Sequence, residues 1–235
     1  KIIVLDAVDD NDIKNIAKAV KLLNIKVLSV DPGPFTNALI SECLKTSAKN
    51  NKVMVVAGSV TSVTRSQMDY LEKYHNGKLI DIDVISMLEG DSGQYLKRKS
   101  DELVQLGCKS RIIGLRVAKK PEMVLDLKSK AEEMGTTVES LSQRITKGLA
   151  QVSRDALNLL KPYVKGIYVT GGDMLAAFCE VTGTAAIDLK DEVMPLVAYG
   201  HLVGGEFDGL GIVSKGGLVG NIESAELCID YILNY

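Results

Sequence analysis

Aromatic residues and histidines are scarce in this sequence of 235 residues, which has no tryptophan, three phenylalanines and two histidines. A row of aromatic side chains that stacks the bases of a single-stranded nucleic acid is therefore not expected. The 28 basic and 30 acidic residues nearly balance and no long basic run is present, so no nucleic-acid partner is predicted. Two histidines are too few to argue for a Ser-His-Asp site, although His201 lies among glycines that could border a ligand.

Cysteines are also few, and the four that occur are widely separated. They form no CxxC pair, so no zinc site is predicted, and a disulfide framework needs more closely spaced cysteines. We therefore expect reduced, mostly buried thiols in a cytoplasmic protein. No apolar run approaches the roughly 18 residues of a membrane span and no signal-peptide pattern opens the chain, so no membrane partner is expected.

Short apolar, β-branched runs alternate with segments of helical periodicity along most of the chain. The chain enters such a run directly after Lys1, which indicates a piece of a longer protein cut at a domain boundary. After Gly183 the sequence is rich in glycine and predicts short strands, followed by a last helix. The alternation predicts an α/β fold with a mostly parallel, helix-covered sheet and a glycine-rich β-containing segment near the C-terminus. The predicted strands are 1–7, 25–30, 52–59, 77–84, 110–117 and 166–170, and the predicted helices include 91–107, 121–134, 137–161 and 222–235.

Ligands of such sheets bind outside the carboxyl ends of the strands, where three polar, glycine-containing clusters occur. The first cluster is AGSVTSVTRSQ, residues 57–67. Hydroxyl side chains crowd the start of the following helix, whose free N–H groups and partial positive charge suit an anion. Ser59 could donate to a phosphate oxygen, whereas Thr61 or Ser62 could simply cap the helix.

The second cluster is TGGDM, residues 170–174, at the junction of a predicted strand and helix. The glycines allow backbone N–H groups to approach a ligand with no Cβ in the way. Asp173 could cap the helix, hold Mg²⁺ through water or bind a ligand hydroxyl. A plain strand-to-helix turn would have the same composition, so the cluster alone decides nothing.

The third cluster is SKGGLVG, residues 214–220, in which Lys215 precedes three glycines. It has the composition of a phosphate loop, but neither the Walker pattern nor G-x-G-x-x-G after a strand is present. A surface loop is the alternative. A loop so rich in glycine is costly to order, which favours a functional role with Lys215 as a candidate phosphate contact.

Taken in order, these clusters resemble the C-terminal half of the four-carbon acid sugar kinase family, which includes threonate, erythronate and 3-oxo-tetronate kinases. The resemblance spans essentially the whole chain, with the spacing preserved. The matching stretches are VLDAVDDNDI (4–13), GSVTSVTRSQ (58–67), GGDM (171–174) and KGGLVG (215–220).

The resemblance implies that residues 1–235 form the nucleotide-binding domain of a two-domain kinase that uses ATP and Mg²⁺. The absent N-terminal domain would hold the small sugar acid and supply the general base, so this fragment alone should be inactive. A homodimer is also a candidate assembly for this family. Asp173 would be the candidate metal ligand, and the residues implied to line the ATP site are Ser59, Gly171, Gly172, Asp173, Met174 and Gly217.

Several positions depart from the family pattern. Met174 stands where the family favours threonine, the segment 192–200 lacks the usual PGVP, and Leu218-Val219 replaces the usual x-Phe. These departures leave open a second hypothesis, a non-catalytic degenerate module that binds a nucleotide or another anion and has a regulatory role. A dinucleotide-dependent dehydrogenase is less well supported, because the acids of LDAVDDND at the first strand-helix junction would repel a pyrophosphate.

Overall fold

The computed structural model describes residues 2–23, 27–46, 51–89, 92–107 and 109–235, without the side chains of 41–46. The chain divides into two compact units, Lys1–Lys49 and Asn50–Tyr235. None of the described helices is both long and apolar enough to cross a membrane.

The first unit consists of two helices that pack on each other, α1 (Asp10–Leu22) and α2 (Pro34–Thr46). The side chain of Asp9 caps α1 by accepting from the backbone N–H groups of the second and third residues of the first turn. The carboxylate of Asp31 accepts a hydrogen bond from the Thr36 hydroxyl and further bonds from N–H groups at the start of α2, and these bonds lower the pKa of Asp31.

The strands predicted in this unit are wrong where they can be judged. Residues 2–7 form no strand, and Ile2 and Val4 are 94% and 91% exposed. Of the strand predicted over 25–30, residues 25–26 lie outside the described residues and 27–30 are not in a strand. The apolar, β-branched composition favours an extended chain, but a strand needs a neighbour for its N–H and C=O groups, and no described segment of this unit pairs with these residues.

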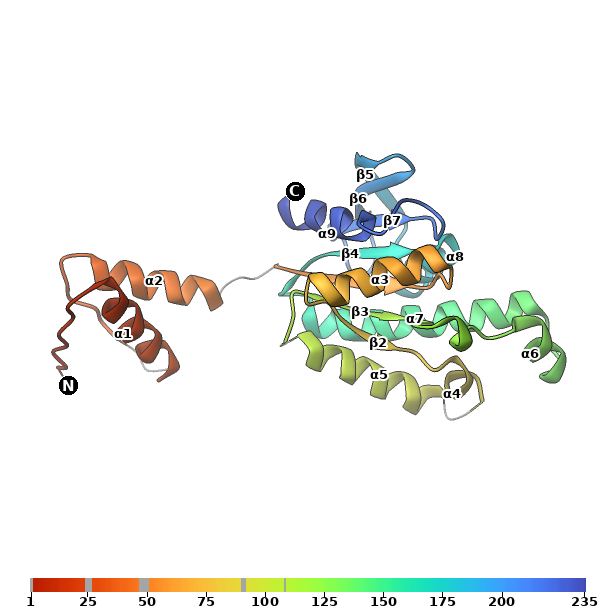
Figure 1. Ribbon diagram of the computed structural model, residues 1–235, viewed down its shortest axis with the longest axis horizontal. Coiled ribbons are helices and arrows are strands. Elements are labelled where there is room, and N and C mark those ends of the chain that lie inside the picture. Colours follow the sequence, from red (N-terminus) through yellow and green to blue (C-terminus); the bar gives the residue numbers. More distant parts are fainter. Residues whose placement is uncertain (1, 24–26, 47–50, 90–91, 108) are drawn as a thin grey trace. The chain divides into compact units, whose positions relative to one another are not determined.

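The second unit is built on a seven-stranded sheet in the order β2-β3-β1-β4-β7-β6-β5. The first five strands in that order, which are β2, β3, β1, β4 and β7, are parallel. The last two, β6 and β5, are antiparallel to their neighbours. The predicted α/β fold with a mostly parallel sheet is thus confirmed (Figure 1). The strands are β1 (Lys52–Ala57), β2 (Lys78–Asp81), β3 (Ile112–Arg116), β4 (Val164–Thr170), β5 (Ala186–Met194), β6 (Val197–Val203) and β7 (Gly211–Lys215).

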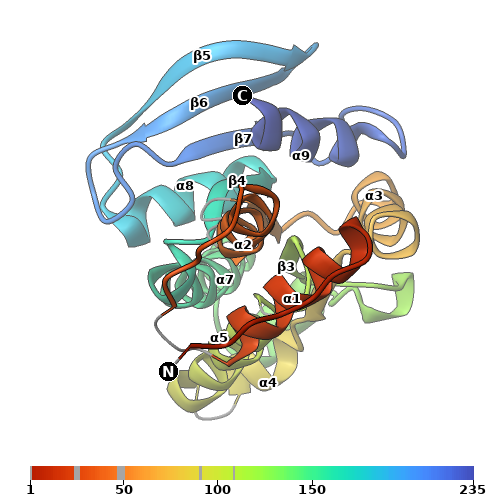
Figure 2. The same cartoon turned by 90° about the vertical axis from the view of Figure 1, so that its left-hand side faces the viewer.

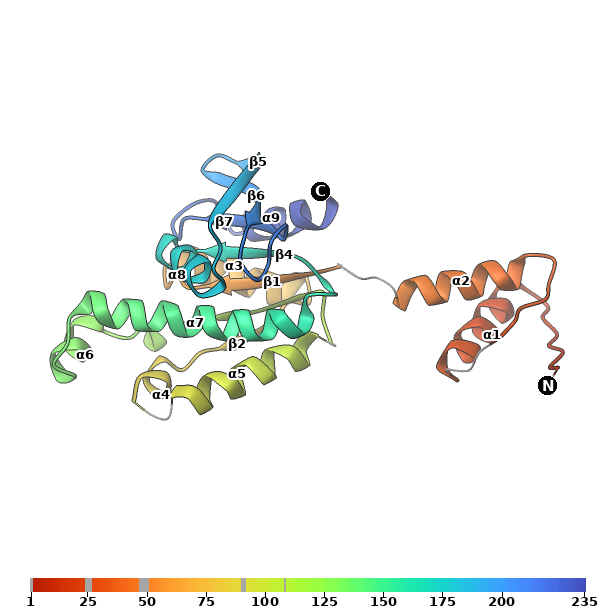
Figure 3. The same cartoon turned by 180° about the vertical axis from the view of Figure 1, so that it is seen from behind.

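Helices cover both faces of this sheet and bury a separate apolar core on each. On one face α3 and α9 pack over β1, β4 and β7, with Met68 and Ile229 among the fully buried contacts. On the other face α7 lies beside α5 and α8, as the view from behind shows (Figure 3). The helices are α3 (Ser62–Tyr74), α4 (Val84–Glu89), α5 (Ser92–Gly107), α6 (Leu127–Glu133), α7 (Val138–Leu160), α8 (Gly172–Thr182) and α9 (Ser224–Asn234), with a 3₁₀ turn at Pro121–Met123.

Aspartate caps explain where the structure departs from two predicted elements. The strand predicted over 77–84 ends at Asp81, because the Asp83 side chain accepts from the N–H groups of Ile85 and Ser86 and begins α4. The helix predicted over 121–134 is interrupted, because Asp126 caps a separate helix α6 in the same way. A carboxylate that can bond to nearby N–H groups competes with continued strand or helix.

A buried arginine joins α3 to the β2–β3 edge of the sheet. Arg116 is 2% exposed, and its three guanidinium nitrogens contact Asp81 at 2.7 Å, Glu72 at 2.9 Å and Asp69 at 3.1 Å. Burial alone would lower the pKa of Arg116, but the carboxylates Asp81 and Glu72 outweigh it and raise the pKa. The guanidinium is therefore a charged cross-link, which sequence periodicity did not single out.

The β5–β6 hairpin turns through two residues, Pro195 and Leu196, between the paired Met194 and Val197. Figure 2 shows this hairpin curving beside β7 and α9. Leu196 has a φ of +68°, and a proline followed by a positive φ is the type II turn pattern, which favours glycine at the second position. A leucine in this conformation costs about 1–2 kcal/mol, and here its side chain is 82% exposed.

Candidate functional site

The three predicted clusters meet at one edge of the sheet. The last residues of β1, β4 and β7 are in register, since Ala57 pairs with Thr170 and Thr170 with Lys215. The Gly58 N–H donates to the Thr170 carbonyl at 3.2 Å, and the Gly171 N–H donates to the Lys215 carbonyl at 3.0 Å. The helices that follow β1 and β4, α3 and α8, cover opposite faces, so these strand ends form a switch point of the kind at which α/β sheets bind ligands.

Hydroxyl groups of the first cluster hold the loop of the third. The Gly217 carbonyl accepts from Thr61 Oγ1 at 2.7 Å and from Thr64 Oγ1 at 3.0 Å. A Cβ on Gly217 would lie 2.2 Å from Ser59 Oγ, so only glycine allows this approach. Thr61 also caps α3 by accepting from the Thr64 N–H, as the capping alternative expected. The site and the cap therefore share side chains, and Ser59 is brought directly beside Gly217.

The N-terminus of α8 presents backbone donors without acceptors. Gly171 has a φ of +108°, which only glycine adopts readily, and its carbonyl accepts the first helical bond, from the Leu175 N–H at 3.0 Å. Among the described residues, nothing accepts from the N–H groups of Gly172, Asp173 and Met174. No atom lies within 4 Å of a Cβ placed on Gly172, so a side chain at this position would enter open space. Three unpaired N–H groups at the positive end of a helix are suited to a phosphate.

Asp173 is exposed and does not cap α8, whose N-cap is Gly171. Its side chain borders a cleft of about 840 Å³ between α7 and α8, where Lys147 and Glu180 form an ion pair at 2.7 Å. No group of three or more acidic, histidine or cysteine side chains suited to a metal occurs among the described residues. Mg²⁺ commonly binds one or two carboxylates together with substrate phosphates, and the single Asp173 carboxylate would fit that pattern if phosphates bound at the N-terminus of α8.

Met174 belongs to the core rather than to the surface of the site. Its side chain is 1% exposed, and its Cβ and Cγ would lie 2.8 Å from a Cβ on Gly58. Gly58 therefore has to be glycine because Met174 occupies the adjacent space. Because its side chain is buried, Met174 could contact a ligand only through its backbone N–H.

Lys215 is turned away from the open space above α8. It is 3% exposed, and its amine donates to the carbonyls of Gly216 at 2.7 Å and Val219 at 2.9 Å. Burial lowers the pKa of Lys215. Gln67 adds a second support, because its amide donates to the carbonyls of Val219 and Asn221. Both side chains support the loop. Gln67 is the last residue of the matching stretch GSVTSVTRSQ, but it was not predicted as a site residue.

The remaining candidates lie elsewhere. His201 pairs with Gly211 at the beginning of β7, opposite the strand ends that form the site, and its ring nitrogen lies 3.0 Å from the Tyr199 hydroxyl. His201 therefore lies away from the strand ends that carry the three clusters. Cys179 and Cys228 carry free thiols, as expected, whereas the side chains of Cys43 and Cys108 fall outside the described residues.

Comparison with known families bears directly on this site. The model of the family described as "Nucleotide-binding C-terminal domain" matches residues 54–224. The chain belongs to this family. The match lies within the second unit and includes all three clusters, which confirms the resemblance to the C-terminal domain of four-carbon acid sugar kinases. That residues 1–49 belong to the same nucleotide-binding domain, as predicted for 1–235, stays a prediction.

Curated relatives of this nucleotide-binding family are named as kinases. A D-erythronate kinase of Heliobacterium modesticaldum is 36% identical over 236 residues, which cover 99% of this chain and 54% of that protein. A D-threonate kinase of Salmonella typhimurium is 27% identical over 94% of this chain and 52% of that protein. The chain thus spans about half the length of the curated relatives it matches.

Solved structures share the fold. A Bordetella bronchiseptica protein with a domain of unknown function, solved with bound citrate as a domain-swapped dimer, has a TM-score of 0.63 and is 21% identical. A Haemophilus influenzae protein has a TM-score of 0.60 and is 18% identical. In both comparisons the matched region covers 97% of this chain and 52% of the solved chain.

Proposed function

We propose that this chain forms the Mg·ATP site of a kinase that phosphorylates a four-carbon sugar acid of the erythronate or threonate type. The observation that carries the proposal is the convergence of Ser59, Gly217 and the free N–H groups of α8 at one switch point of the sheet. The names of the two kinase relatives support the substrate class.

The residues of the site would act by positioning and by neutralising charge, which is most of what phosphoryl transfer requires. The N–H groups of Gly172, Asp173 and Met174 would donate to phosphate oxygens, reinforced by the helix dipole. The Ser59 hydroxyl would also donate to a phosphate oxygen, and the Asp173 carboxylate would hold Mg²⁺ through water. Gly217 keeps the space clear, and Lys215 keeps the loop in place instead of contacting the phosphates.

The sugar acid and its general base are proposed to belong to residues outside this chain. The described site offers phosphate donors, but no histidine and one exposed carboxylate, Asp173, beside them. We therefore expect the isolated chain to bind Mg·ATP without transferring phosphate at a useful rate. A cytoplasmic location and a homodimer complete the proposal, the latter supported by the domain-swapped dimer of the Bordetella relative.

A second candidate is a non-catalytic module that binds a nucleotide or another anion. Two observations favour it. The Lys215 amine bonds to loop carbonyls, and Met174, which stands where the family favours threonine, has no hydroxyl and packs in the core.

The test is a transfer assay on the full-length natural protein, with ATP and either D-erythronate or D-threonate, followed by ³¹P NMR. The proposed kinase gives a phosphorylated sugar acid and ADP, and the chain of residues 1–235 gives neither. If the full-length protein binds Mg·ATP but phosphorylates no four-carbon acid, the kinase assignment fails and the binding module replaces it.

A further inference from the structure

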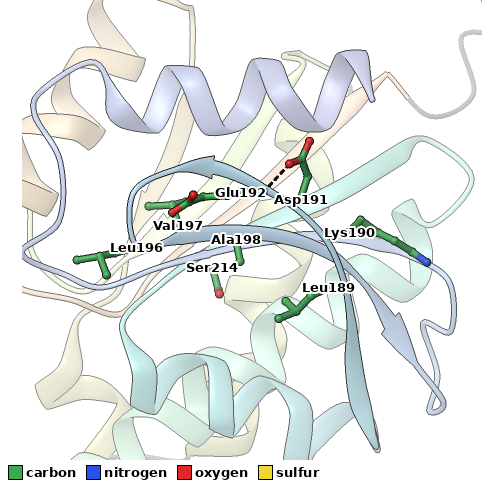
Figure 4. A pocket seen from close by; sticks show the side chains of 8 residues that line it. All are labelled: Leu189, Lys190, Asp191, Glu192, Leu196, Val197, Ala198 and Ser214. Carbon is green, nitrogen blue, oxygen red and sulfur yellow. Dashed lines mark hydrogen bonds between the residues drawn. The ribbon is translucent and has the colours of Figure 1, made fainter.

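A pocket of about 480 Å³ lies on the β5–β6–β7 part of the sheet. Figure 4 shows Leu196 and Leu189 on either side of it, with the small residues Ala198 and Ser214 between them on the strands. Asp191 points the other way, toward α9, where it accepts a hydrogen bond from the Tyr231 hydroxyl. The pocket therefore has two leucine walls and a floor of small side chains with the Ser214 hydroxyl, and the charged residues Lys190, Asp191 and Glu192 also line it.

This pocket lies close to the proposed phosphate site. Ser214 is paired with Ala198 in the sheet and lies three residues before Gly217, which limits their separation to about 10 Å. A Cβ on Gly220 would lie 3.4 Å from the Met194 side chain, so the glycine loop and the β5–β6 hairpin touch. A nucleotide whose phosphates lie at Gly217 has its base within reach of this pocket.

Leu196 is the unusual wall of the pocket. It holds a positive φ in a turn that favours glycine, and its side chain is 82% exposed, so packing within the described chain offsets little of the strain. Strained backbone of this kind is found at ligand clamps. A bound flat ring would cover the leucine and remove it from water.

We propose that this pocket takes the heteroaromatic base of the nucleotide, held between Leu196 and Leu189 over Ala198, with the Ser214 hydroxyl bonding to the edge of the ring. The proposal rests on the proposed function, because it assumes phosphates at Gly217 and α8. The volume of the pocket, about 480 Å³, lies within the range of small-molecule sites.

Calorimetric titrations of the chain with Mg·ATP and with magnesium tripolyphosphate test the proposal, since tripolyphosphate has the phosphates without the base. Leu196→Gly removes one wall and relieves the turn, and Ala198→Leu fills the floor. Leu159→Ala is the control, an exposed leucine of α7. Leu196→Gly should weaken Mg·ATP binding by about tenfold, the loss expected for part of a leucine contact. Ala198→Leu, which occupies the space of the base, should weaken it at least as much, and both variants should leave tripolyphosphate binding unchanged. Leu196→Gly should also raise the melting temperature.

Other outcomes would overturn the proposal in distinguishable ways. Unchanged Mg·ATP binding in both pocket variants would exclude the base from this pocket and leave the phosphate site standing. An equal loss of Mg·ATP and tripolyphosphate binding in Leu196→Gly would show that the turn supports the glycine loop instead. Absence of binding of either compound to the unaltered chain would refute the phosphate site and the base pocket together.

Discussion

Placing a methyl group on Gly217 should disturb both the stability and the ligand site of this domain. A Cβ there would lie 2.2 Å from Ser59 Oγ and 2.8 Å from Ser59 Cβ. Rotation of the Ser59 side chain relieves only the first contact, so the backbone must move. That movement would disturb the bonds that the Gly217 carbonyl accepts from Thr61 and Thr64. We expect Gly217→Ala to lower the free energy of unfolding by about 2 kcal/mol, the usual penalty of overpacking.

The second variant of this experiment removes the obstacle. Ser59→Gly deletes both atoms that a Cβ on Gly217 would meet, and the double variant should therefore recover most of the loss. Urea unfolding of the four proteins of the cycle gives the coupling free energy, which we expect to be at least about 1 kcal/mol. Mg·ATP binding should stay weak in the double variant, because the hydroxyl donor is gone. Additive losses, within about 0.5 kcal/mol, would refute the contact between the two clusters.

Two further predictions concern the scaffold. Arg116→Met should lower the free energy of unfolding by about 2–3 kcal/mol, because partly exposed acids lose a buried partner. Lys119→Met, which removes an exposed contact to Glu72, should lower it by under about 1 kcal/mol. Equal effects of the two substitutions in urea unfolding would contradict this account. Burial raises the pKa of Cys228 to about 12 from an ordinary 9.0, so the unfolded chain loses this proton first and the free energy of unfolding falls as the pH rises between those values. Lys215, with its lowered pKa, acts in the opposite direction. Cys228→Ala removes the contribution of the thiol, so the slope of the free energy of unfolding against pH should become less negative by up to about 1.4 kcal/mol per pH unit. Equal slopes in the two proteins would show that Cys228 is not buried as a thiol.

The candidate site could be located from sequence because its chemistry is local. Glycines and hydroxyls directly after apolar strands mark strand ends, and parallel strands bring their carboxyl ends to one edge. What sequence could not supply was the order of the strands. The contact between Ser59 and Gly217 depends on β1 lying next to β4 and β4 next to β7, which are pairings between distant segments.

Side-chain direction was the second limit. Lys215 stands in a glycine loop, and a charge there suggests a ligand contact, but its long side chain folds beneath the loop and bonds to two carbonyls instead. Met174, on the first turn of α8, also points inward, because its apolar side chain packs against Gly58. Residues 2–7 show the third limit, since β-branched composition predicts a strand only where a neighbouring strand is present.

The most direct test of the phosphate site is a calorimetric titration of Gly172→Asp with Mg·ATP, beside the unaltered chain and Gln151→Asp, an exposed control of equal charge on α7. Nothing lies within 4 Å of the added Cβ, and an acid in the first turn of a helix stabilises it by about 0.3–1 kcal/mol, so the melting temperature should not fall. A carboxylate about 4 Å from the phosphates should weaken binding by about 100-fold or more, whereas the control should bind as the unaltered chain does. Equal Mg·ATP affinity in all three proteins would show that the phosphates do not bind at the N-terminus of α8.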